Sequence, residues 1–122
     1  MPAPSADAQF LLLLRQPYEG PPPAPEELRE IMGHFGRWMD GLRAKGAVVG
    51  TNGLEFGGKV LRGRRGVTMS DGPFAETKEI VGGYVLIKAD TLAQAVEFAR
   101  DCPGLDYRMS VEVRPVKTMR ST

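Results

Sequence analysis

Apolar residues recur with two different periods along the chain, and the longer period predicts helices. After Pro25 they recur at spacings of three and four, which draws one stripe on a helix that ends at Gly46. The stripe consists of Leu28, Ile31, Met32, Phe35, Met39 and Leu42. A second helix is predicted after Thr91, which has capping-box spacing to Gln94, and Pro103 ends this helix.

The shorter apolar segments predict strands. These are residues 10–14, 47–51, 59–62, 67–70, 84–89 and 109–114. The third and fourth segments flank a GRRG turn and are predicted to form a hairpin. The order β-α-β-(hairpin)-β-α-β predicts an α+β fold of the ferredoxin-like type, an antiparallel sheet with two helices on one face.

Two of the predicted strands are apolar on both faces. Residues 10–14 read FLLLL and residues 84–87 read YVLI, without the alternation that a half-solvated sheet requires. Two helices cover only one face, so a single copy would expose a large apolar patch on the other. We therefore predict a homodimer in which a second copy packs against the open face.

Length and composition predict one domain without a cofactor. The 122 residues are expected to form a core at about residues 9–117, with flexible ends at residues 1–8 and 118–122. The 16 Lys and Arg nearly balance the 15 Asp and Glu, so no direct nucleic-acid partner is expected. One histidine and one cysteine leave no metal-ligand spacing, and we expect no metal and no organic cofactor.

The amino-terminal sequence bears on location. Its apolar run at residues 10–14 is too short to cross a bilayer, and no basic residue precedes that run as in a secretory signal. We therefore expect a cytoplasmic protein that does not bind membranes.

A motif at the end of the hairpin is the most distinctive feature of the chain. Residues 70–79 read SDGPFAETKE and are followed by GGY at residues 82–84. Together with Trp38 and Leu42, a CP pair at residues 102–103 and VEVRPV at residues 111–116, they resemble the DGPF branch of the YCII-related family. The resemblance extends over roughly residues 9–117.

That resemblance implies a bacterial protein with a ferredoxin-like fold that pairs into a dimeric α+β barrel. It implies no known reaction. Some members of the wider family pair a histidine with an aspartate in a cleft, which suggests enzymatic activity. Other DGPF proteins are encoded near, or fused to, extracytoplasmic-function sigma factors, which suggests an accessory role.

Asp71 and His34 are the candidate catalytic residues. Asp71 ends a strand before Gly72 at the predicted mouth of the barrel, where a carboxylate could serve as general acid or base. The alternative, which we favour, is that Asp71 accepts backbone hydrogen bonds in a turn. His34 lies at the edge of the apolar stripe, one turn before Trp38, and could titrate in a cleft. We favour a partly exposed border position, because the sequence GHF at residues 33–35 does not clearly reproduce the family's histidine motif.

Further residues are candidate ligand contacts. Trp38, Phe74 and Tyr84 are predicted to line a cleft beside Asp71. Arg114 alternates with valines along the last strand, so it faces the partner and could bind an acid such as Asp71 or an anionic ligand.

Glu76 and Lys78 complete the candidate ligand contacts. In an extended chain their side chains share a face, which allows an ion pair there.

Two functions follow from these features. The first is a small-molecule-binding or cofactor-independent proton-transfer protein with a cleft near Asp71. The alternative is a non-catalytic accessory module associated with an extracytoplasmic-function sigma factor.

Overall fold

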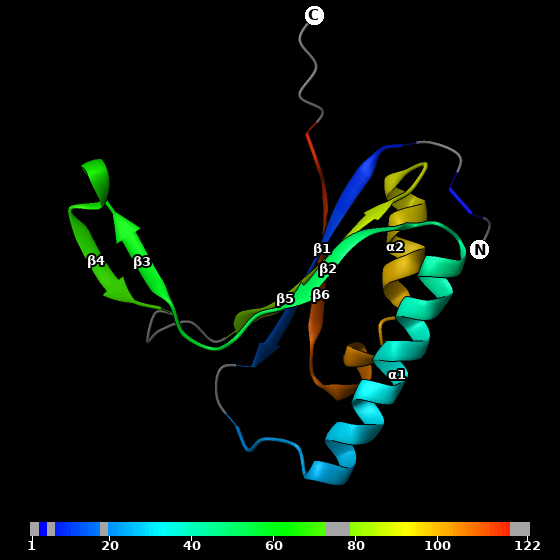
Figure 1. Cartoon of the computed structure of the whole chain (residues 1–122), viewed down its shortest axis with the longest axis horizontal. Helices are drawn as coiled ribbons and strands as arrows, with labels where there is room; N and C mark the ends of the chain where they lie inside the picture. Colours follow the sequence, from blue (N-terminus) through cyan, green and yellow to red (C-terminus); the bar gives the residue numbers. More distant parts are fainter. Residues whose placement is uncertain (1–2, 5–6, 18–19, 73–78, 118–122) are drawn as a thin grey trace, which may run out of the picture.

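The structure, a computed structural model, describes residues 3–4, 7–17, 20–72 and 79–117. Figure 1 shows two helices on one side of a twisted sheet, with a hairpin that projects from the other side. The elements, with η for a 3-10 turn, are β1 Gln9–Pro17, α1 Pro25–Ala44, β2 Val48–Gly53, β3 Lys59–Arg62, η1 Arg64–Gly66, β4 Thr68–Asp71, β5 Glu79–Lys88, α2 Leu92–Arg100, η2 Pro103–Tyr107 and β6 Ser110–Pro115.

The main sheet has four strands in the order β2-β5-β1-β6, and each neighbouring pair is antiparallel. The strands β1 and β2, joined by α1, are separated by β5, which comes later in the chain. This split β-α-β arrangement on a sheet with helices on one face confirms the ferredoxin-like α+β fold. The strands β3 and β4 form a separate two-stranded sheet.

The strand β5 starts earlier than predicted. It begins at Glu79 rather than at residue 84, so that Gly82 and Gly83 lie inside the strand. A side chain at Gly83 would come within 3.1 Å of the carbonyl oxygen of Asn52, and one at Gly82 within 2.7 Å of Gln16 Oε1. Both glycines therefore allow β5 to approach its neighbours closely.

Both helix starts and the end of α1 are those that the sequence predicts, whereas α2 ends at Arg100, before the predicted stop at Pro103, which instead starts η2. The helix α1 starts at Pro25 and is followed by Gly46 at a φ of 68°, a left-handed conformation that favours glycine. At the start of α2 the Oγ1 of Thr91 accepts a hydrogen bond from the backbone N–H of Gln94 at 3.1 Å. In return, Gln94 Oε1 accepts from the backbone N–H of Asp90 at 2.6 Å. These contacts confirm the cap predicted for α2.

The core lies between the helices and the sheet. Alternate residues of β1 and β5 point into it, and Leu12, Val85 and Ile87 are the largest side chains that are fully buried. The other buried apolar residues are Phe10, Leu14, Trp38, Met39, Leu42, Ala47, Ala89, Ala95, Phe98, Ala99 and Cys102. This single cluster joins both helices to the two central strands.

The first half of α1 departs from the expected burial. Only Trp38, Met39 and Leu42 are buried on this helix, whereas Leu28 is 48% and Met32 is 62% exposed. In Figure 1 the first turns of α1 stand away from the sheet, so this part of the apolar stripe has no sheet to pack against. The apolar stripe that the sequence predicts is therefore buried only in the second half of α1.

The opposite face of the sheet is open in the single chain. Leu11 and Leu13 of β1 stand beside Leu86 and Tyr84 of β5, respectively, and these four side chains are half-buried. They alternate with the buried core residues of the same strands, so they point away from the helices. Both central strands are thus apolar on both faces, as the sequence predicts.

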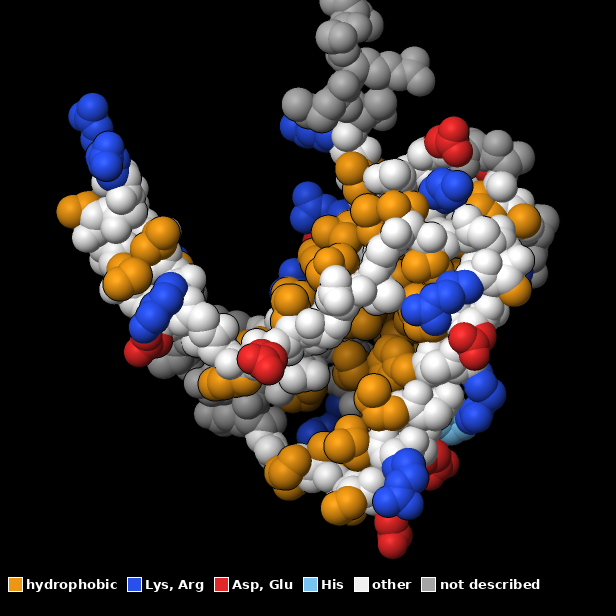
Figure 2. All heavy atoms as spheres, in the orientation of Figure 1, with side chains coloured by type: hydrophobic (Ala, Val, Ile, Leu, Met, Phe, Trp, Pro, Cys, Tyr) orange, Lys and Arg blue, Asp and Glu red, His pale blue; other side chains and the backbone are white. Residues whose placement is uncertain are grey.

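The hairpin arm, residues 59–71, projects from the body of the protein (Figure 1). Its strands pair from Lys59 with Asp71 to Arg62 with Thr68, which agrees with the predicted hairpin. Large apolar side chains are exposed along it, namely Leu61, Val67 and Met69. Figure 2 shows the wide hollow that separates this arm from the sheet.

Candidate functional site

An apolar pocket of about 500 Å³ lies between α1 and the helix-facing side of the sheet. We call it the α1 pocket. The exposed first half of the α1 stripe forms one wall, and Leu14 and Val85 of the sheet face it. Figure 2 shows apolar side chains gathered in this hollow. The remaining apolar residues of its wall include Pro21, Pro23, Ile31, Phe35, Met39 and Met109.

Two local features shape the far wall of the α1 pocket. In η2, a side chain at Gly104 would come within 2.6 Å of Met109 Sδ and 3.2 Å of Phe35 Cζ. The glycine therefore lets η2 pack closely against two residues of the pocket wall. The second feature is the proline segment before α1. Prolines have a restricted φ and no N–H, so this part of the pocket wall is stiff.

Two polar side chains of β2 near the α1 pocket are engaged within the protein, and that of Asn52 lies with Tyr84 on the open face of the sheet. Thr51 Oγ1 donates to the carbonyl oxygen of Tyr84 at 2.8 Å, and Asn52 Nδ2 donates to Tyr84 Oη at 3.1 Å. These bonds fix the end of β2 against β5. The pocket thus presents mainly apolar surface to a ligand, the property typical of small-molecule sites.

Trp38, a predicted ligand contact, borders the α1 pocket. Its indole Nε1 donates to the carbonyl oxygen of Phe98 at 3.0 Å, and its ring packs edge-on against Phe35 with centroids 6.0 Å apart. The Phe98 carbonyl lies in the last turn of α2, where helix carbonyls lack helical partners. Trp38 therefore joins the two helices, and only its ring can contact a ligand.

His34 lies on α1 outside the α1 pocket, beside a second hollow of about 490 Å³ between α1, α2 and η2. Arg37 Nη2 donates to His34 Nδ1 at 2.7 Å, and Glu30 Oε1 lies 3.7 Å from Nε2. Both ring nitrogens of His34 thus lie beside charged side chains of the same helix. Its side chain is 40% exposed, which agrees with the border position that we favoured.

Asp71 ends β4 on the hairpin arm, and its side chain is 85% exposed. Its Oδ1 accepts a hydrogen bond from Lys59 Nζ at 2.5 Å across the hairpin. An exposed ion pair of this kind contributes about 0–1 kcal/mol. In the single chain, Asp71 therefore lies near neither Trp38 nor His34, and no cleft is formed around it by the described residues.

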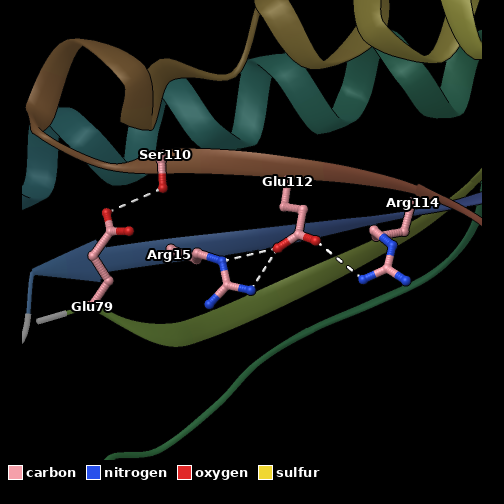
Figure 3. A network of polar contacts seen from close by, with 5 residues as sticks. All are labelled: Arg15, Glu79, Ser110, Glu112 and Arg114. Carbon is pink, nitrogen blue, oxygen red and sulfur yellow. Dashed lines mark hydrogen bonds and ion pairs between the residues drawn. The ribbon is translucent and has the colours of Figure 1, made fainter. Parts of the chain in front are cut away.

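Tyr84 and Arg114 lie on the open face of the sheet, opposite Trp38. Tyr84 is paired with Leu13, and Arg114 with Leu11 on the next strand. Arg114 points away from the helices, as the alternation of β6 predicts (Figure 3). The remaining predicted contacts, Phe74, Glu76 and Lys78, lie outside the described residues.

A polar network crosses this open face (Figure 3). Glu112 lies between two arginines: Arg15 Nη2 donates to its Oε1 at 2.6 Å, and Arg114 Nη1 donates to its Oε2 at 3.2 Å. Arg114 is therefore engaged with Glu112 in the chain, rather than with Asp71. Nearby, Ser110 Oγ donates to Glu79 Oε2 at 3.2 Å.

The hydrogen bond from Arg15, followed by that from Arg114, lowers the pKa of the Glu112 carboxyl. A depressed pKa in the folded state means that ionised Glu112 stabilises the fold above the ordinary carboxyl pKa of about 4.3. This stabilisation is lost as the pH falls through the lowered folded pKa. The network thus links the open face to acid stability.

We expect Glu112→Gln to lower the free energy of unfolding at pH 7, and the deficit to shrink as the pH falls below about 4. Urea unfolding of both proteins between pH 7 and pH 3 measures this. In an Arg15→Gln background the same substitution should show a much weaker pH dependence, because the main hydrogen-bond donor is gone. A deficit that is constant with pH would contradict the role given to the arginines.

The buried Cys102 is a poor nucleophile. Desolvation by burial raises the pKa of its thiol, which keeps the thiol protonated. In the described part of the chain, no three His, Cys, Asp or Glu side chains gather into a group that could hold a metal ion. No helix within the described ranges is long and apolar enough to span a membrane.

Sequence reasoning missed most of the α1 pocket. Leu28 and Met32 were predicted only as part of the helical stripe and Met109 as part of a strand, and Arg108 was not considered. The available signal was the length of the α1 stripe, which extends beyond what a short sheet can cover. The approach of η2 to α1 depends on tertiary packing around Gly104 and has no local sequence pattern.

Comparison with known proteins gives two findings. Residues 10–120 match the YCII-related domain. An uncharacterized protein of Rhizobium meliloti (strain 1021) is 47% identical over 58 residues, which are 46% of this chain and 47% of that protein. The chain thus matches this curated relative over about half of the relative's length.

Proposed function

The chain belongs to the YCII-related domain family, and on that premise we propose that it is a small-molecule-binding protein whose ligand occupies the α1 pocket. Within the family we assign it to the DGPF branch, on the sequence SDGPFAETKE of residues 70–79. We further propose a bacterial, cytoplasmic protein with one domain.

The observation that carries this proposal is the exposed apolar wall of α1. Leu28 and Met32 are 48% and 62% exposed on a helix whose other half is buried in the core. Covering apolar surface releases about 25 cal/mol per Å². A ligand that fills about 500 Å³ beside these side chains gains this energy without a large rearrangement of the protein.

A matched pair of leucines tests the proposal. Leu28 in α1 lines the pocket and Leu92 in α2 does not, yet both are 48% exposed. With the neutral fluorescent probe N-phenyl-1-naphthylamine, Leu28→Gln should weaken binding several-fold, because it places an amide in the apolar wall. Leu92→Gln should bind the probe like the wild type.

Two outcomes would contradict ligand binding at the α1 pocket. One is a wild type that does not bind the probe at all. The other is equal weakening by the two substitutions, which would place the probe elsewhere. In either case the accessory-module alternative, in which the chain supports an extracytoplasmic-function sigma factor, takes first place.

We also propose that the protein works as a homodimer. The half-buried Leu11, Leu13, Tyr84 and Leu86 form an apolar strip on the open face, opposite the helices. The hairpin arm, with its exposed apolar side chains, flanks the same side of the sheet (Figure 1). A second copy could cover both surfaces at once in a two-fold arrangement.

Proton transfer at Asp71 or His34 has a further requirement. A general acid or base must lie within hydrogen-bonding reach of a bound substrate. Asp71 is exposed on the hairpin arm, so the second copy would have to enclose it. We therefore place ligand binding first and assign catalysis by these residues, as a hypothesis, only to the dimer.

A further inference from the structure

Arg108 has a distinctive place at the edge of the α1 pocket. It follows η2 directly, with a φ of 66° in the left-handed region, and lies between Tyr107 and Met109, which also border the pocket. Its guanidinium lies against the backbone of Gly20, where a side chain would come within 3.2 Å of Nη2. Gly20 itself has a φ of 125°. A residue other than glycine there would be strained and would displace the guanidinium.

Arg108 is the one charged side chain among the described residues that line the α1 pocket. The other polar groups are neutral, and Thr51 and Asn52 are bonded to Tyr84. No carboxylate of the described residues forms an ion pair with Arg108, whereas Arg15, Arg43, Arg100 and Arg114 each have an acidic partner. The pocket therefore combines an apolar interior with a single positive charge that has no protein counter-ion in the described chain.

Building on the proposed function, we infer that the ligand of the α1 pocket is an apolar carboxylic acid, bound as the anion with its carboxylate on Arg108. A planar guanidinium donates two parallel hydrogen bonds to a carboxylate, which gives orientation as well as attraction. The apolar body of the acid then covers the exposed side chains of α1. A neutral ligand would leave the guanidinium without a counter-ion, and a cationic ligand would be repelled.

A pair of ligands that differ in charge tests this inference. The affinities of 4-phenylbutyrate and 4-phenylbutan-1-ol are measured by displacement of N-phenyl-1-naphthylamine. The wild type should bind the carboxylate about tenfold or more tightly than the alcohol, since hydrogen bonds to charged partners are the stronger kind. The ratio of the two affinities is the readout, because a general change in pocket shape cancels in it.

Arg65 provides the matched control. It is also an arginine in the left-handed conformation, with a φ of 58°, but it lies in η1 at the tip of the hairpin arm. Asparagine tolerates this conformation, so Arg108→Asn and Arg65→Asn both keep an allowed backbone while removing one charge. Arg108→Asn should reduce the ratio to about one, and Arg65→Asn should keep the wild-type ratio.

Salt gives a second measurement that needs no variant. The wild-type preference for the carboxylate should fall as the ionic strength rises from about 0.1 M to 1 M, because the exposed ion pair is screened. A preference that survives in Arg108→Asn, or a wild type that binds both ligands equally while still binding the neutral probe, would overturn the inference. The latter result leaves small-molecule binding intact, so the two proposals fail separately.

Discussion

Replacing Leu12 with aspartate is expected to leave the chain largely unfolded at 25 °C. Leu12 is 0% exposed, on the helix-facing side of the central strand β1. Loss of a buried leucine alone costs about 2–5 kcal/mol, and an aspartate there buries a carboxyl group without a partner for several more. The sum approaches the whole stability of a small domain, about 5–15 kcal/mol. Circular dichroism and urea unfolding measure the loss.

The neighbouring Leu13→Asp is the matched variant and should behave differently. Leu13 points to the open face beside Tyr84 and Glu112, where water reaches a single chain. We expect the variant to fold and to remain a monomer in light scattering at micromolar concentration, where the wild type should be a dimer. A monomeric wild type, or a dimeric Leu13→Asp, would contradict the proposed role of the open face.

Trp38→Ala is expected to cost about 3–5 kcal/mol, because it removes a large buried side chain that joins α1 to α2. Trp38→Phe distinguishes the packing of the indole ring from the hydrogen bond of its N–H. It keeps an aromatic ring beside Phe35 but leaves the Phe98 carbonyl without its donor, at a cost of about 1–3 kcal/mol in addition to the lost volume. Urea unfolding of both variants is followed by circular dichroism. Tryptophan fluorescence cannot serve, because both substitutions remove Trp38, the single tryptophan.

Tyr107→Phe is the control for Trp38→Phe. Tyr107 is half-buried at the pocket edge, and removing its hydroxyl should change stability by less than about 0.5 kcal/mol. If Trp38→Phe is equally mild, the bond to Phe98 does not stabilise the contact between the helices.

The sequence was sufficient for the fold because its local signals agree with one another. Pro25 and Gly46 bound one helix, and the Thr91 cap starts the other. The lack of alternation in β1 correctly indicated two apolar faces, since Leu12 and Leu13 have opposite environments. Such signals lie in residues that are close in the sequence, so they can be recognised from the sequence alone.

The candidate site was harder to predict because it depends on distances between remote segments. A motif beside a hairpin suggested a cleft at Asp71, but Asp71 pairs with Lys59 at the base of the projecting arm and is 85% exposed in the single chain. Conversely, nothing in the sequence around Arg108 shows that Gly20 will lie beside it. The α1 pocket forms where α1, η2 and the proline segment before α1 come together. No periodic pattern in the sequence predicts that these three segments are close in space.

The position of β5 between β1 and β2 has a consequence for synthesis on the ribosome. The sheet cannot be completed before β5 is made, because β5 lies between β1 and β2 and is hydrogen-bonded to both. At about 5–20 residues per second, β1 waits several seconds for its first neighbour in the main sheet. During that time only α1, β2 and the hairpin arm have been made, and none of them pairs with the five consecutive apolar residues at 10–14. The nascent chain is therefore most exposed to aggregation just before residues 79–88 emerge, and a chaperone that shields strand β1 would act in that interval.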